Sequence, residues 1–356
     1  MPSIRLAFAL LSFVPSVACA QASTTPSTPQ FPVGFRVDRL SDPTRPFASA
    51  PGAEPGPRPI QAYLWYPAAG SCATPMTWGE VVEWVGVEGS HDMIDSACAE
   101  AGRSEFVAWI GSMGGDTTAA RASLEFPLRA CQDAAAAPGA HPLVLLAVGR
   151  NDSPAMHALL GEELASYGWV VLSSTGLGAR RRTMDFVAAD IEAQVADLEA
   201  LASHAESLDF VDPSRPDVVG YSSGGGTAIL YAMEDMTVSA VVSLDGSIGF
   251  ADRVPAYVSL PGWRPDRASR LSVLHMRAPD EERKDLSALE GIGRVVIMTF
   301  DRATHSDFTT LGPVSASGLP IEALGLDDSD GDEIHAEILA EVVEFLGPIR
   351  PLPLRD

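Results

Sequence analysis

Short apolar runs alternate with helical stretches through the C-terminal part of the chain, from Pro142 onward. The runs are aliphatic or β-branched and lack polar alternation, which is typical of strands that are buried on both faces. We expect strands at 143–148, 169–173, 218–219, 238–244, 271–276 and 294–300, and helices at 155–167, 186–207, 225–233 and 334–346. Alternation of strands and helices predicts a parallel sheet with right-handed crossovers.

The N-terminal part of the chain has a different pattern. Two extended segments, 33–39 and 60–65, flank turn material at 41–59 that is rich in Pro and Gly. This arrangement predicts a hairpin or meander.

Residues 68–140 have the least regular pattern in the chain. Helix is favoured at 81–87, 106–111 and 117–124. We interpret this segment as an insertion or cap on one domain that spans 31–356, and we expect it to shape a binding pocket.

The first residues are typical of a secretory signal peptide. Arg5 precedes an apolar run at 6–14, and Ala18-Cys19-Ala20 supplies the small-x-small pattern of a cleavage site. We predict cleavage after Ala20 and export to the periplasm or the extracellular space, with residues 21–30 as a disordered tether. A lipoprotein modified at Cys19 is the second alternative.

The formal net charge of −23 argues against nucleic acids and anionic lipids as partners, because phosphates would be repelled. No segment after the leader is long and apolar enough to predict a membrane-spanning helix, so stable membrane insertion is not expected.

Cleavage would leave three cysteines, Cys72, Cys98 and Cys131. An odd number allows at most one bridge within the chain, and the sequence leaves open which two residues pair. No CxxC pattern or nearby histidine pair accompanies them, so we expect no metal site.

A candidate nucleophile lies at Ser222, in the segment Gly-Tyr-Ser-Ser-Gly at 220–224. The segment stands between an apolar strand and an apolar helix, which is the context that a nucleophile elbow requires. A tight strand-to-helix turn exposes the serine hydroxyl and needs small neighbours. The alternative is a glycine-rich turn without chemistry.

The base and the acid are sought after the later strands, where the carboxyl ends of a parallel sheet hold the chemistry. His305 follows the strand that is expected to end at Phe300. Asp245 and Asp280 both follow strands and both keep the order serine, acid, histidine. We favour Asp245, because Asp280 begins a charged run at 280–285 that resembles a solvated surface.

These motifs together resemble the platelet-activating-factor acetylhydrolase-like and dienelactone-hydrolase-like branch of the α/β hydrolases. The resemblance rests on Gly-Tyr-Ser-Ser-Gly-Gly around Ser222, Ser-Leu-Asp-Gly-Ser around Asp245 and His-Ser-Asp-Phe at His305. It covers roughly 31–67 and 142–347 by inspection of motifs. It implies an α/β-hydrolase fold, with a mostly parallel central sheet and helices on both faces. It further implies hydrolysis of small-molecule carboxylic esters, with lipid-like esters among the candidates, and no metal or cofactor.

The chain departs from that branch where the relatives carry His-Gly-x-Gly, because Val-Gly-Arg-Asn-Asp stands at 148–152. An oxyanion hole needs backbone N–H groups rather than particular side chains. We therefore assign its donors to Ser223 and Arg150. The side chain of Arg150 would also select substrates at the pocket mouth; alternatively it is a surface arginine paired with Asp152.

Three functions remain open from the sequence. The first is an esterase that acts through an acyl-enzyme on Ser222, with His305 as base and Asp245 as orienting acid. The second is a serine peptidase or amidase on the same fold. The third is a hydrolase-fold protein that binds without catalysis.

Overall fold

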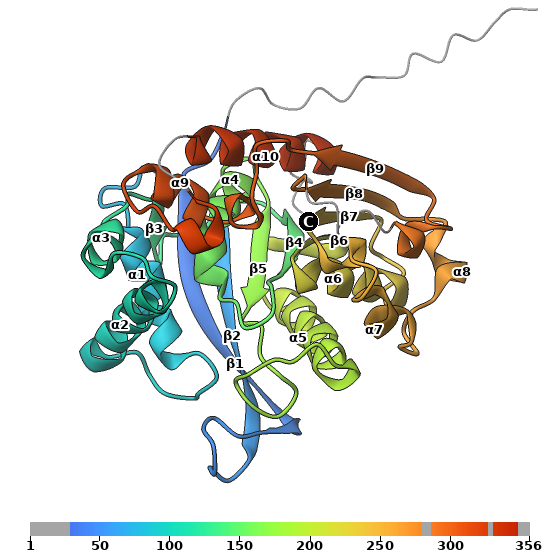
Figure 1. Ribbon diagram of the computed structural model, residues 1–356, viewed down its shortest axis with the longest axis horizontal. Coiled ribbons are helices and arrows are strands. Elements are labelled where there is room, and N and C mark those ends of the chain that lie inside the picture. The colour runs from blue at the N-terminus through green and yellow to red at the C-terminus, as the bar shows by residue number, and fades with distance from the viewer. Residues whose placement is uncertain (1–28, 280–285, 327–329, 348–356) are drawn as a thin grey trace, which may run out of the picture.

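The computed structural model describes residues 29–279, 286–326 and 330–347. A nine-stranded sheet runs through the molecule with the strand order β3-β1-β2-β5-β4-β6-β7-β8-β9 (Figure 1). Its strands are β1 (Val33–Phe47), β2 (Gly56–Pro67), β3 (Ala130–Gln132), β4 (His141–Ala147), β5 (Val170–Ser174), β6 (Val211–Tyr221), β7 (Ala240–Leu244), β8 (Ser272–Arg277) and β9 (Arg294–Thr299). The leader and most of the tether that the sequence predicts lie outside the described residues.

The sheet is mostly parallel, as predicted. Strands β5, β4, β6, β7, β8 and β9 pair with parallel neighbours, while β2 is antiparallel to both β1 and β5. The predicted N-terminal hairpin is confirmed, but its first strand continues to Phe47 instead of ending near 39. The register shifts between Asp42 and Pro46, so Pro43 falls where the ladder is interrupted and needs no N–H.

Helices cover both faces of the sheet (Figure 1). The α-helices are α1 (Trp78–Val82), α2 (Ser96–Ser112), α3 (Thr117–Ser123), α4 (Ala158–Ser166), α5 (Ala188–Ala205), α6 (Ser223–Glu234), α7 (Val254–Val258), α8 (Pro265–Ala268), α9 (Leu311–Ala316) and α10 (Gly331–Leu346). Short 3₁₀ turns are η1 (Glu83–Val87), η2 (Pro154–His157), η3 (Ser247–Gly249), η5 (Ser287–Leu289), η6 (His305–Phe308) and η7 (Glu322–Leu324). Helices α4, α9 and α10 lie over one face, and α5, α6 and α7 lie over the other.

Each face of the sheet has its own hydrophobic core. In β4, Val144 and Leu146 belong to one core, whereas Leu143 and Leu145 belong to the other. Both sets of side chains are therefore buried, which explains the absence of polar alternation in this strand.

The segment 68–140 folds as α1, η1, α2, α3 and β3 at the β1 edge of the sheet. A disulfide joins Cys72 to Cys131, and Cys98 is free, which answers the pairing that the sequence left open. Buried Trp78 donates its indole N–H to the carbonyl oxygen of Ala155 at 2.8 Å, so the segment is anchored to η2.

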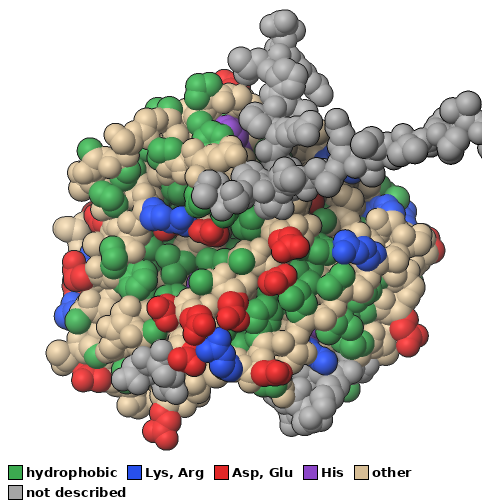
Figure 2. Space-filling model, turned by 90° about the horizontal axis from the view of Figure 1, so that it is seen from above, with side chains coloured by type: hydrophobic (Ala, Val, Ile, Leu, Met, Phe, Trp, Pro, Cys, Tyr) green, Lys and Arg blue, Asp and Glu red, His purple; other side chains and the backbone are tan. Residues whose placement is uncertain are grey.

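The predicted helix 155–167 is divided into η2 and α4, and the prediction missed α7, α8, α9 and β3, which are short. No helix in the described ranges combines the length and apolar character that crossing a membrane needs. Figure 2 shows acidic side chains interleaved with hydrophobic ones on the face seen from above, in keeping with the negative net charge.

Candidate active site

Ser222 occupies a strained turn between β6 and α6. Its backbone has φ 53° and ψ −121°, a conformation that L-residues rarely adopt. A Cβ on Gly220 would lie 2.1 Å from the carbonyl oxygen of Gly224, and one on Gly224 would lie 2.0 Å from that of Ala147. The strand and the helix pass so closely that glycine is required at both positions. The turn presents the Ser222 side chain at the carboxyl edge of the parallel strands.

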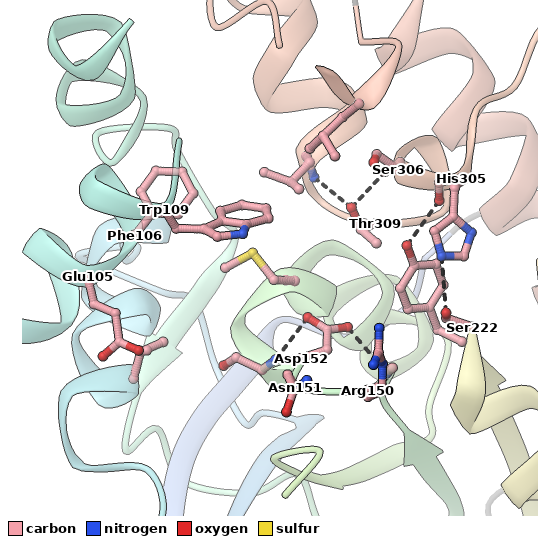
Figure 3. Close-up of a pocket in the computed structure, with 17 residues that line it drawn as sticks. Glu105, Phe106, Trp109, Arg150, Asn151, Asp152, Ser222, His305, Ser306 and Thr309 are labelled. Atoms are coloured by element: carbon pink, nitrogen blue, oxygen red, sulfur yellow. Dashed lines mark hydrogen bonds between the residues drawn. The ribbon is translucent and has the colours of Figure 1, made fainter. Parts of the chain in front are cut away.

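His305 begins η6, which follows β9. Its Nε2 lies 3.1 Å from Ser222 Oγ (Figure 3). The imidazole stacks on the ring of Tyr221, with centroids 4.8 Å apart and an interplanar angle of 22°. The Tyr221 hydroxyl donates to the carbonyl oxygen of His305 at 3.1 Å. Tyr221 therefore supports the histidine through both its ring and its hydroxyl.

Asp245 follows β7 and is 1% exposed. Its Oδ2 lies 2.6 Å from His305 Nδ1, and its Oδ1 accepts from the backbone N–H of Ala278 at 3.0 Å. The structure thus brings together Ser222, His305 and Asp245 in one hydrogen-bonded line. Asp280, the alternative acid, lies outside the described residues.

The expected oxyanion donors lie beside Ser222. Ser223 is the first residue of α6, so its N–H is not used by the helix, and the helix N-terminus favours negative charge. A Cβ on Gly149 would lie 3.3 Å from the Ser222 Cβ, which places the loop carrying Arg150 against the serine. Within the described part of the chain, neither the Ser223 nor the Arg150 N–H has a hydrogen-bond acceptor.

The pairing of Arg150 with Asp152 that the sequence suggested is not found. Within the described ranges, the Asp152 carboxylate bonds to His157 instead, and the exposed Arg150 guanidinium has no ion-pair partner.

A cavity of about 460 Å³ opens over Ser222 and His305. Phe106 and Trp109 of α2 form its wall opposite the histidine (Figure 3), and Trp109 is 41% exposed. The remaining apolar lining comes from Val85, Met156, Tyr221, Leu311 and Leu324. The segment 68–140 therefore contributes aromatic side chains to this cavity.

A second cavity of about 260 Å³ also reaches Ser222, and it is more polar. Arg150 lines both cavities. The second cavity is further lined by Phe186, Ser247, Phe250, Asp252 and Arg253. The serine thus stands between an aromatic compartment and a polar one.

Buried Glu88 directly follows η1 and is bonded to Ser153, which lines the first cavity. Its Oε1 accepts from the Tyr63 hydroxyl at 2.7 Å and from Ser153 Oγ at 2.6 Å. Burial raises the pKa of Glu88 to about 7. No local pattern in the sequence marks this residue, because its partners lie 25 and 65 positions away.

Two further histidines have structural environments. His275 of β8 bonds Ser243 Oγ, and His335 of α10 bonds the carbonyl oxygen of Asp307. Burial lowers the pKa of each to about 4, so each is held neutral near pH 7. In the described residues, no three His, Cys, Asp or Glu side chains cluster as metal ligands would.

No family model matches the chain. A stretch of 54 residues is 41% identical to the quorum-quenching protein AidA of Acinetobacter baumannii, and this match spans 15% of the chain and 18% of that protein.

Among solved structures, the ferulic acid esterase from Streptomyces cinnamoneus matches 94% of this chain and 95% of its own, with a TM-score of 0.65 and 22% identity. Est1E from Butyrivibrio proteoclasticus, with bound ferulic acid, matches 59% of this chain and 91% of its own at 14% identity, with a TM-score of 0.42. The match to the Streptomyces structure extends over nearly the whole of both chains. With this likeness and the mostly parallel strand order, the chain has the α/β-hydrolase fold.

Proposed function

We propose that the protein is a serine esterase that cleaves carboxylic esters through an acyl-enzyme on Ser222. The observation that carries this proposal is the line from Ser222 Oγ to His305 Nε2 (3.1 Å) and from His305 Nδ1 to Asp245 Oδ2 (2.6 Å). The name of the Streptomyces neighbour, a ferulic acid esterase, supports the same class of reaction.

The proposed reaction begins when Ser222 Oγ attacks the ester carbonyl and His305 Nε2 takes its proton. Asp245 accepts from His305 Nδ1–H, which holds the imidazole with a free lone pair on Nε2 and stabilises its protonated form. The tetrahedral oxyanion accepts hydrogen bonds from the backbone N–H groups of Ser223 and Arg150. His305 then gives the proton to the leaving alcohol, and water repeats the sequence on the acyl-enzyme.

We propose that the substrates are small esters with one apolar or aromatic group. The half-exposed Trp109, backed by buried Phe106, supports this proposal, because aromatic cavity walls bind flat apolar groups by stacking and by burial of apolar surface. The smaller, more polar cavity that Ser222 also lines would accept the second half of the ester.

The test compares wild type and Ser222→Ala on matched aryl esters and aryl amides. An esterase hydrolyses the esters far faster than the amides, and Ser222→Ala loses about 10³-fold or more of its kcat. Preference for the amides would favour the peptidase or amidase alternative. Equal activity of the variant and the wild type would refute Ser222 as nucleophile.

We also propose that the protein is exported. The disulfide between Cys72 and Cys131 supports this proposal, because such bonds persist in oxidising compartments. Mass spectrometry of protein from its native host tests it: the mature chain should begin at Gln21, and a chain that retains residues 1–20 would refute it.

A further inference from the structure

We propose that Asp152 and His157 are positioning residues that hold the Arg150 N–H ready for the oxyanion. This inference rests on the proposed function. Asp152 and His157 would not touch the substrate themselves and would act through the loop that carries Arg150.

The Asp152 carboxylate binds both ends of the loop that carries Arg150. Its Oδ2 accepts from the backbone N–H of Gly149 at 3.3 Å, and its Oδ1 accepts from the backbone N–H of Ser153 at 2.8 Å (Figure 3). Gly149 precedes Arg150 directly, so this contact fixes the peptide plane next to the donor. One side chain therefore closes the loop around the amide that is expected to meet the oxyanion.

His157 fixes the carboxylate from the buried side. Its side chain is fully buried, and its Nε2 lies 2.8 Å from Asp152 Oδ2. An ionised carboxylate can only accept, so Nε2 is the donor. Within the described part of the chain, His157 Nδ1 has no hydrogen-bond partner. Its bond to Asp152 is therefore the hydrogen bond that orients this ring in the described residues.

The same pair is connected to the base. The His157 ring lies against the Tyr221 ring, with centroids 4.9 Å apart, and the Tyr221 ring also stacks on that of His305. Asp152, His157 and Tyr221 therefore form a continuous support between the donor loop and the base.

The loop also holds a strained residue. Asn151 has φ 58°, and its side chain accepts from the Met184 N–H at 2.6 Å and donates to the Met184 carbonyl oxygen at 3.1 Å. Its own N–H donates to the carbonyl oxygen of Gly176 at 3.1 Å. Strained backbone persists where its surroundings fix it from several sides. Asn151 and Asp152 together leave the Arg150 amide little freedom to turn.

The test is Asp152→Asn, which keeps size and removes one acceptor. The amide nitrogen must then face the N–H of Gly149 or that of Ser153, and the loop loses one of its two ties. We expect kcat on an aryl acetate to fall about 10- to 100-fold, less than for removal of a donor outright, with KM within about threefold.

A trifluoromethyl ketone distinguishes positioning from a merely structural role, because it forms a tetrahedral adduct with the serine. Its inhibition constant should rise by the same factor as kcat/KM falls. Glu162→Gln is the matched control, because Glu162 is also buried and accepts two backbone N–H groups, from Arg129 and Ala130. It should keep wild-type ketone affinity.

An Asp152→Asn enzyme with kcat within threefold of wild type would overturn the proposal, and so would a loss of kcat with unchanged ketone affinity. If that variant does not fold, His157→Gln is tested by the same two measurements. We expect its kcat to fall and its ketone inhibition constant to rise, each by about 3- to 30-fold. This outcome differs from failure of the proposed function. If the proposed function is wrong, Ser222→Ala stays active, whatever Asp152→Asn does.

Discussion

Replacing Asp245 by asparagine should reverse the tautomer of His305. In the native site, Asp245 Oδ1 accepts from the Ala278 N–H at 3.0 Å, and Oδ2 faces His305 Nδ1 at 2.6 Å. An asparagine keeps its oxygen toward Ala278, because an NH₂ group there would meet another donor. The NH₂ group then faces Nδ1, which must accept, so the imidazole proton moves to Nε2.

A proton on Nε2 points at Ser222 Oγ, 3.1 Å away, and blocks the transfer that starts the reaction. A wrong tautomer of this kind lowers kcat roughly 10⁴-fold in a serine protease triad. Loss of the carboxylate also removes charge stabilisation of the imidazolium. We expect a fall of about 10³- to 10⁴-fold in kcat, which is about 4–5.5 kcal/mol of transition-state stabilisation.

The assay measures kcat and KM on 4-nitrophenyl acetate for Asp245→Asn and Asp280→Asn, together with the urea midpoint of each. We expect Asp280→Asn to stay close to wild type. Asp245 is not the orienting acid if Asp245→Asn folds and keeps kcat within tenfold of wild type. A larger loss in Asp280→Asn than in Asp245→Asn would move the acid to Asp280.

Three further predictions concern the surroundings of the site. Because burial raises the pKa of Glu88 to about 7, the folded state binds this proton more tightly than the unfolded state, and stability falls as pH rises from about 4.5 to 7, by at most about 3 kcal/mol. Urea unfolding at pH 5 and pH 8 should therefore show a smaller fall in the free energy of unfolding between these pH values for Glu88→Gln than for wild type. Equal falls would contradict a raised pKa of Glu88. Trp109→Ala should lower kcat/KM for a cinnamate ester relative to an acetate ester about 3- to 10-fold, and an unchanged ratio would remove Trp109 from substrate binding. Replacing Cys72 and Cys131 by serine opens a loop with a sequence separation of 59 and should lower the free energy of unfolding by about 4 kcal/mol in the chain-entropy model. Urea unfolding of this double variant measures the loss, and a midpoint equal to that of oxidised wild type would contradict it.

Much of the sheet was predictable because its strands are short aliphatic runs that are buried on both sides. Leu143 to Leu146 illustrate this pattern, since successive side chains enter different cores. The positions of Ser222, Asp245 and His305 were predictable for a related reason. Each follows a strand, and the carboxyl ends of parallel strands meet at one edge.

Other features depend on contacts that no local pattern carries. The pairing of Cys72 with Cys131 follows from the path of the chain between them, and three pairings were open from the sequence. The fold of residues 68–140 is set by packing against the β1 edge. The segment was therefore expected to shape a pocket, but its sequence did not indicate that Trp109 would line the cavity. Asp152 was considered only as a partner for Arg150, and its bond to His157 needed the backbone turn at η2.

The most direct test of the central claim is to trap the acyl-enzyme. The protein is mixed with a 4-nitrophenyl ester, quenched in acid within the first turnover and digested for mass spectrometry. We expect one added acyl group on the peptide that contains Ser222, and none in Ser222→Ala. An acyl group on another residue, or full turnover by Ser222→Ala, would contradict it.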